Sequence, residues 1–126
     1  MNNVIYLAGR DQRACIVLVE RDPLVRMALA APLRQAGLSV LEAVDSSEAL
    51  ALLRSGRTIA VVLGELNPDA AAAIGREFAE VKLLVECAGD SPSMLHGDAA
   101  MVGRPYNPPK LLQTINALLS QPKIQK

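Results

Sequence analysis

The sequence is poor in the residues from which disulfide frameworks and zinc sites are built. It contains two cysteines, Cys15 and Cys87, and one histidine, His96. Two cysteines do not make the multi-bridge framework of small secreted domains, and a cytosolic pair is more often reduced and buried. A single histidine excludes a His-rich zinc site. We therefore look for function among the acidic, basic and amide side chains.

No run of basic residues occurs. The chain carries 13 Lys and Arg residues against 13 Asp and Glu residues, and the formal net charge is zero. A protein that binds nucleic acid needs a clustered positive surface to neutralise phosphates. We therefore expect no nucleic-acid partner.

Long apolar segments are also absent from the sequence. The apolar stretches are short and interrupted by charge, and residues 1–13 lack the basic start and long apolar centre of a signal peptide. We therefore expect no membrane association and a cytoplasmic location.

What is present is the composition of one globular domain. The chain has 126 residues, of which 51% are hydrophobic and 21% charged. This is enough for one core and too little for two. We divide it into an N-terminal leader (1–13), a domain (14–121) and a C-terminal tail (122–126). The leader contains Val4-Ile5-Tyr6-Leu7, which fits either an extra strand or a disordered tail.

Five short apolar runs are typical of buried strands. Ala14–Glu20 (ACIVLVE) is rich in β-branched residues, too short for a typical helix and too continuous for an exposed strand. The other candidates are weaker: Leu38–Val44, Thr58–Leu63, Lys82–Cys87 and Ala99–Gly103.

Helix start signals follow four of these runs. Asp22, Asn67 and Asn107 each precede a proline, which places an N-cap acceptor before a residue suited to the first helical position. Asp45-Ser-Ser-Glu48 resembles a capping box. Alternating strands and helices predict a doubly wound α/β domain with a five-stranded parallel sheet and helices on both faces. The segment 90–96 contains Pro92, so we expect the fourth helix to be short or loop-like.

Ligand sites in open parallel sheets lie at the carboxyl ends of the strands, beside the point where strand order reverses. The residues that follow the predicted strands are therefore the candidates for a site. They are Glu20, Arg21 and Asp22, then Gly64, Glu65 and Asn67, then Cys87, and finally Arg104.

The order of these segments resembles the receiver domain of bacterial response regulators. IVLVERDPLVRMAL and LRQAGLSVLEAVDSSEALALL are similar to its first half, VVLGELNP to its third strand, VKLLVECAG to its fourth, and GDAAMVGRPYNPPKLL to its fifth. The resemblance covers roughly residues 14–119. It implies a CheY-like, flavodoxin-like fold with strand order 2-1-3-4-5, and a role in two-component or phosphorelay signal transduction.

The resemblance fails at the residues that carry the family's chemistry. Receiver domains hold Mg²⁺ with an acidic pair and an acceptor aspartate, because a hard cation needs oxygen ligands. Here Glu20 keeps one acid, but Arg21 stands at the second position and Glu65 at the acceptor position. A glutamate reaches one methylene further, so its oxygens miss the place required for in-line attack. Anchoring the comparison on Pro68 instead would put Gly64 at the acceptor position.

Three further positions complete this degenerate phospho-acceptor pocket. Cys87 replaces the family's threonine and is a weaker donor, while Arg104 replaces its lysine. Asn67 fits the position whose backbone carbonyl usually touches the metal. The resemblance therefore implies a pseudo-receiver that is not an enzyme, with no catalytic residue and no expected metal or cofactor.

One hypothesis ties these substitutions together. Glu65 would supply a permanent carboxylate, with Arg21 or Arg104 as its partner in place of Mg²⁺ and lysine, and so lock the domain in one state. Asp22 and Asn67 also have a purely structural interpretation as helix N-caps.

The partners implied by the resemblance are proteins: a histidine kinase, another receiver, or a downstream signalling protein. Pairing of two copies as a homodimer is a further alternative. The family contacts partners through its fourth helix, fifth strand and fifth helix, so the contact candidates, which also suit a core, are Met94, Leu95, Met101, Val102 and Tyr106.

Two other functions remain open. In the first, the chain is still phosphorylated with Mg²⁺ at an unconventional carboxylate, with Glu20, Asp22 and Glu65 as weak metal candidates. In the second, it is a flavodoxin-like module for a small ligand. Neither a Walker-type nor a G-x-G-x-x-G phosphate loop occurs in the sequence, which disfavours the second function.

Overall fold

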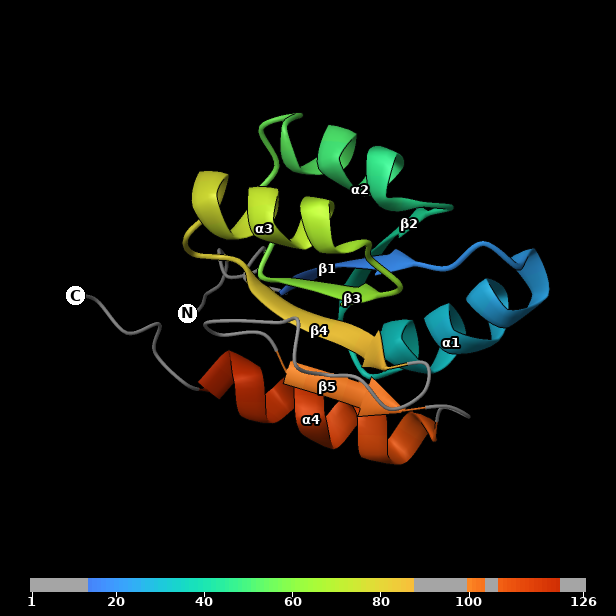
Figure 1. Ribbon diagram of the computed structural model, residues 1–126. Coiled ribbons are helices and arrows are strands. Elements are labelled where there is room, and N and C mark those ends of the chain that lie inside the picture. Colours follow the sequence, from blue (N-terminus) through green and yellow to red (C-terminus); the bar gives the residue numbers. More distant parts are fainter. Residues whose placement is uncertain (1–13, 88–99, 104–106, 121–126) are drawn as a thin grey trace.

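A computed structural model describes residues 14–87, 100–103 and 107–120. Its strands and helices alternate along most of the chain (Figure 1). In chain order they are β1 (Cys15–Val19), α1 (Pro23–Gln35), β2 (Ser39–Ala43), α2 (Ser46–Leu53), β3 (Val61–Gly64), α3 (Pro68–Glu77), β4 (Lys82–Cys87), β5 (Ala100–Gly103) and α4 (Pro108–Ser120).

The strands form one parallel sheet in the order β2-β1-β3-β4-β5. β1 therefore lies between β2 and β3, and the direction in which the chain adds strands reverses at this point. The predicted parallel α/β architecture is confirmed. Three predicted segments lie outside the described residues. They are the short helix expected at 90–96, the leader (1–13) and the tail (122–126).

Helices cover both faces of the sheet, as Figure 1 shows. α1 and α4 pack on one face, where their apolar residues join Ile16 and Leu18 of β1 in one buried cluster. α2 and α3 pack on the other face, where Val17 and Val19 join a second cluster. Consecutive residues of β1 thus enter opposite layers, which explains why this strand is apolar without alternation.

The predicted helix caps are confirmed. The side chains of Asp22, Asp45 and Asn67 each accept a hydrogen bond from a backbone N–H in the first turn of the following helix. Asn107 does the same for α4, accepting from the N–H of Lys110 at 3.2 Å. The capping box at α2 differs in one detail, because Glu48 accepts from the N–H of Val44, one residue before the cap.

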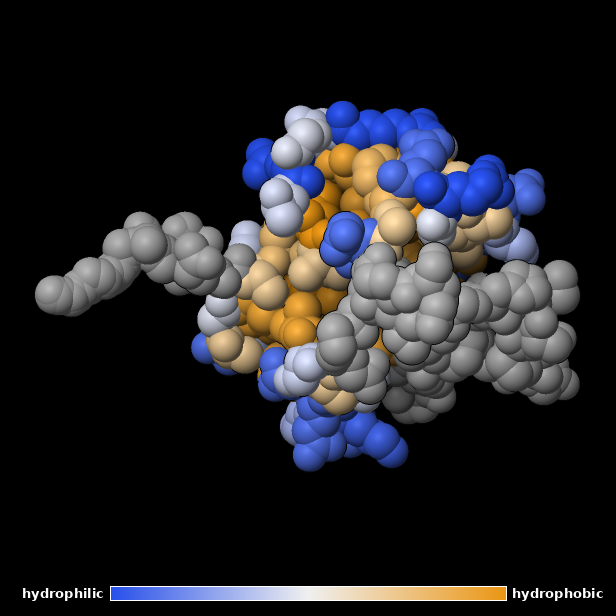
Figure 2. All heavy atoms as spheres, turned by 90° about the vertical axis from the view of Figure 1, so that its left-hand side faces the viewer, coloured by the Kyte–Doolittle hydropathy of each residue, from blue (hydrophilic) through white to orange (hydrophobic). Residues whose placement is uncertain are grey.

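Polar contacts also join the elements at the surface. Arg54 and Glu77 form two hydrogen bonds, of 3.0 and 2.7 Å, between the end of α2 and the end of α3. At the same end of the sheet but on its opposite face, the buried Lys82 donates from Nζ to the carbonyl of Leu118 at 2.6 Å and so binds the last turn of α4. Figure 2 looks onto the amino ends of the strands, where apolar side chains fill the middle between two hydrophilic borders.

None of the helices within the described ranges is long and apolar enough to cross a membrane.

The cap of α2 gives a direct test of how this fold begins its helices. Asp45→Ala removes the oxygen that accepts from the N–H of Glu48 at 3.0 Å. We expect the free energy of unfolding to fall by about 1 kcal/mol in urea denaturation. Ser47→Ala, at an exposed position of the same turn, is the matched control and should change it by less than about 0.5 kcal/mol. Equal effects of the two changes would contradict the assigned cap.

Candidate functional site

The candidate site lies where β1 and β3 end side by side. Val19 and Gly64, the last residues of the two strands, are register partners. The next residues, Glu20 and Glu65, therefore leave the sheet at the same edge, and the N–H of Glu65 donates to the carbonyl of Val19 at 3.4 Å. On its other side β1 is fixed by the N–H of Glu20, which donates to the carbonyl of Ala43 at 2.9 Å.

A cavity of about 340 Å³ opens at this edge. It lies at the reversal of strand order, where open α/β sheets usually bind ligands, and extends toward the start of α2. The residues that line it come from the ends of β1, β2 and β3 and from the turns that follow: Val19, Arg21, Val44, Asp45, Ser46, Ser47, Glu65, Leu66 and Asn67.

Gly64 closes β3 in a conformation that only glycine adopts easily. Its φ is +131°, and a Cβ built on it would overlap the carbonyl oxygen of Val19. No side chain can therefore stand at this position without moving the two central strands apart. The acidic residue nearest this strand end along the chain is Glu65, which is exposed and borders the cavity.

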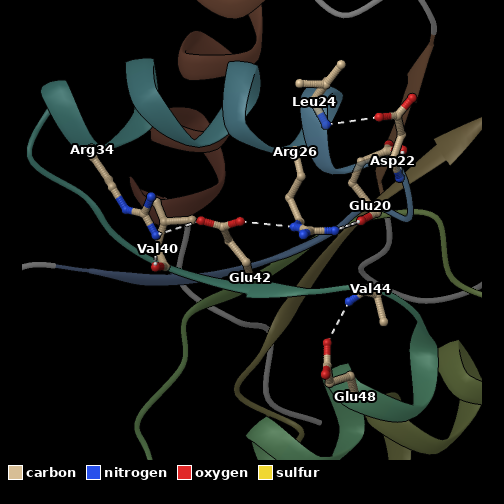
Figure 3. A network of polar contacts seen from close by, with 9 residues as sticks. All are labelled: Glu20, Asp22, Leu24, Arg26, Arg34, Val40, Glu42, Val44 and Glu48. Carbon is tan, nitrogen blue, oxygen red and sulfur yellow. Dashed lines mark hydrogen bonds and ion pairs between the residues drawn. The ribbon is translucent and has the colours of Figure 1, made fainter.

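Glu20 is buried, with 4% of its surface exposed. Its Oε2 accepts a hydrogen bond of 3.0 Å from the backbone N–H of Asp22, and its carbonyl accepts one of 2.7 Å from Nη1 of Arg26 (Figure 3). The carboxylate therefore takes part in the turn between β1 and α1. Glu20 does not border the cavity.

Asp22 is exposed and caps α1. Its Oδ1 accepts from the N–H of Leu24 at 2.9 Å (Figure 3). The structural interpretation of Asp22 is thus confirmed. The same is true of Asn67, whose Oδ1 accepts from the N–H of Ala70 at 2.7 Å.

Ser46 is a site residue that the sequence prediction missed. Its Oγ accepts from the N–H of Asn67 at 3.2 Å, and it borders the cavity together with Asn67. This bond ties the turn after β3 to the first residue of α2. A serine directly after an N-cap aspartate gives no local sign of such a contact, because the contact depends on how the two turns are placed.

The sequence prediction also missed the ion pairs that join α1 to β2. Glu42 accepts from Arg26 Nε at 3.0 Å through Oε1, while its Oε2 lies 3.1 Å from Arg34 Nη2 (Figure 3). Arg34 also donates to the carbonyl of Val40 at 2.8 Å. The hydrogen bond from Arg26, with a further contribution from Arg34, holds the pKa of the Glu42 carboxyl below its ordinary value, although burial acts in the opposite direction.

Arg21 and Glu65 both border the cavity and both are exposed. Within the described part of the chain, no ion pair joins them. The lock predicted between Glu65 and Arg21 is therefore absent from this arrangement. Its alternative with Arg104 concerns a residue outside the described ranges.

The remaining predicted site residues are placed only by their backbone or not at all. Cys87 is the last residue of β4 and pairs with Gly103. Met101 and Val102 belong to β5. Met94, Leu95, Arg104 and Tyr106 lie outside the described residues, so the predicted contact surface and the two substitutions at Cys87 and Arg104 remain predictions.

The two acidic side chains that follow β1 already accept hydrogen bonds from backbone N–H groups. One oxygen of Glu20 accepts from a backbone N–H, one oxygen of Asp22 caps a helix, and Arg21 places a cation beside Glu65 at the cavity. A hard divalent cation needs several convergent oxygens. Among the described residues, no three Asp, Glu, His or Cys side chains gather closely enough to hold a metal ion.

Comparison with known proteins identifies the fold. No protein-family model matches the sequence, and no curated protein matches it. Solved structures do match. A response regulator receiver protein from Sinorhizobium medicae superposes with a TM-score of 0.77 at 16% identity, covering 86% of this chain and 95% of that one.

Two other solved structures give similar values. The chemotaxis response regulator CheY4 of Vibrio cholerae has a TM-score of 0.73 at 20% identity and covers 84% of this chain and 98% of its own. A response regulator from Thermotoga maritima has a TM-score of 0.73 at 20% identity, with 86% and 99% coverage. The chain therefore has the fold of CheY-like receiver domains, over nearly the whole length of those proteins.

The close approach at Gly64 predicts an unusually large effect of a single methyl group. We expect Gly64→Ala to lower the free energy of unfolding by more than about 3 kcal/mol, or to prevent folding, because the Cβ meets a backbone oxygen of a central strand. Gly56 is the matched control, since it also has positive φ (+94°) but has open space around it. Gly56→Ala should cost only about 1 kcal/mol in urea unfolding. Similar costs for both variants would contradict the overlap.

The pKa of Glu42 predicts how stability depends on pH. A carboxyl whose pKa is lowered by folding stabilises the protein above its unfolded-state value of about 4.3, and this contribution is lost as the pH falls through the folded-state value. Glu42→Gln should therefore be less stable than the parent at pH 7, by about 1 kcal/mol.

The difference between Glu42→Gln and the parent should shrink as the pH falls below about 4. Urea unfolding from pH 7 to pH 2.5 measures it. Glu77→Gln, which breaks the exposed pair with Arg54, is the control and should have a smaller effect at pH 7. A difference for Glu42→Gln that does not change with pH would show that the ion pairs are not its source.

Proposed function

We propose that this chain is an atypical receiver domain of two-component or phosphorelay signalling, which acts by protein–protein contact without conventional aspartyl phosphorylation. The fold shared with CheY-like receivers supports the signalling role. Among the solved structures with this fold is the receiver domain of the hybrid histidine kinase CckA, at 21% identity and a TM-score of 0.71. Receiver folds thus occur both as separate regulators and within kinases.

One observation carries the unconventional part of the proposal. Glu65 is the first residue after β3, beside β1, where the sequence resemblance places the phospho-acceptor. The preceding Gly64 has no room for a side chain, so a shift of alignment by one residue supplies no acceptor. A glutamate at this position offers a carboxylate that is displaced from the in-line geometry of phosphoryl transfer.

The surroundings of Glu65 support the same conclusion. Arg21 replaces one acid and puts positive charge at the cavity, while Glu20 and Asp22 make hydrogen bonds within the β1–α1 turn. Glu65 and Arg21 thus place one acidic and one basic side chain at the cavity, an arrangement that does not depend on a phosphorylation cycle. The domain is then a binding module and not an enzyme.

The partners of such a module are proteins of the same signalling system: a histidine kinase, another receiver or a downstream effector. A cytoplasmic location follows from this role. The contact residues at the β5 end of the sheet, with Met101 and Val102 in the strand, remain part of the proposal.

Intact-protein mass spectrometry after incubation with acetyl phosphate and Mg²⁺ tests this function. The parent chain should gain no phosphoryl mass, because Arg21 and Glu65 replace the second acid and the acceptor. The double variant Arg21→Asp, Glu65→Asp restores both family residue types and should gain measurable phosphoryl mass if the rest of the pocket is receiver-like. A known receiver in the same reaction confirms that the donor is active.

Two outcomes contradict the proposal in different ways. Phosphoryl mass on the parent, mapped to Glu20, Asp22 or Glu65, would favour phosphorylation at an unconventional carboxylate. No phosphoryl mass on either chain, together with no histidine kinase or receiver bound in a pull-down in which a control receiver succeeds, would argue against a signalling role.

A further inference from the structure

The outward face of α1 is apolar, although it lies on the surface. Leu24 is 74% exposed and Met27 is 62% exposed. Ala28 and Ala31 are exposed beside them. These four residues recur at helical spacing of three and four, so they form one stripe along the helix. Figure 3 shows Leu24 pointing away from the sheet.

Charge is missing from this stripe. Between Asp22 and Arg34 the only charged residue of α1 is Arg26, and it turns toward the sheet, where it binds Glu42 and the carbonyl of Glu20. A surface helix normally places polar residues on its solvent side and apolar residues on its core side. α1 is apolar on both sides, because Leu29 and Leu33 are buried in the core beneath it.

We propose that the stripe of Leu24, Met27, Ala28 and Ala31 is an interface between two copies of this chain, in which two α1 helices pack antiparallel about a two-fold axis near Ala28. In this arrangement Leu24 of one copy lies against the Ala31 end of the other, and Met27 lies against Ala28. Each large side chain meets a small one, which allows the helices to approach closely. A two-fold axis repeats the same contacts on both sides.

The charges at the two ends of the stripe favour this antiparallel arrangement. The exposed Asp22 precedes Leu24, and Arg34, whose side chain is 48% exposed, follows Ala31. They are separated by about 18 Å along the helix axis. When the helices are antiparallel, Asp22 of each copy lies near Arg34 of the other, whereas a parallel pair would bring like charges together. The helix dipoles also favour the antiparallel arrangement, because the positive end of each helix then lies near the negative end of the other.

The size of the stripe limits the strength of the contact. We expect one helix from each copy to bury less than the roughly 1,200 Å² of a standard interface. The dimer should therefore be weak, with a Kd on the order of 100 µM. Its formation therefore depends on the concentration of the chain.

Sedimentation equilibrium of the full chain between about 5 and 500 µM tests the interface. The parent should pass from monomer to dimer over this range. Leu24→Glu and Met27→Glu should each weaken dimerisation at least tenfold, because they bring like charges into the seam. Neither should change the urea unfolding midpoint of dilute protein, since both side chains are exposed in the monomer.

A disulfide test fixes the geometry independently. Ala28→Cys places a thiol on the proposed axis, where its own counterpart lies within bonding distance, so mild oxidation should give a covalent dimer. Ala51→Cys, at an exposed position of α2, is the matched control and should cross-link several-fold less, as should the parent with its native cysteines. A parent that is monomeric at the highest concentration, a dimer that survives Leu24→Glu, or equal cross-linking of the two cysteine variants would each overturn the proposal.

Discussion

The pairing of β1 with β3 at Val19 and Gly64 is the constraint on which the candidate site depends. The two backbones approach so closely that only a glycine fits at the end of β3. This approach sets the register, and the register brings Glu20 and Glu65 out of the sheet at the same edge. The cavity opens there because the chain adds β2 on one side of β1 and β3 on the other.

The acidic residues after β1 have mainly structural partners. Glu20 accepts from the N–H of Asp22, and Asp22 caps α1. Arg26 then joins this turn to Glu42 of β2 (Figure 3). These bonds hold one oxygen of each carboxylate within the turn. This is the physical reason to interpret the edge as a fixed arrangement of charges, with Arg21 and Glu65 facing the cavity.

Local signals made much of the fold predictable, whereas the contacts between elements were not. The strands are short apolar runs, and Asp22, Asp45, Asn67 and Asn107 cap helices that start immediately after them, so both can be inferred from neighbouring residues. The network of Arg26, Arg34 and Glu42 depends on how α1 crosses β2. The hydrogen bond from Asn67 to Ser46 depends on the relative positions of the turn after β3 and the start of α2. Sequence spacing therefore predicted neither of these two contacts. It also did not predict that the cavity extends toward α2.

The most direct test of the central claim is an amide NMR titration of the ¹⁵N-labelled chain with Mg²⁺ and beryllofluoride, an analogue of the phosphoryl group. A site of fixed charges predicts no saturable shifts at the amides of Gly64, Glu65 and Asn67, while a known receiver under the same conditions shows them. Saturable shifts confined to these amides and to those of residues 20–22 would mean that the edge still assembles a phosphoryl and metal site, and would contradict the account.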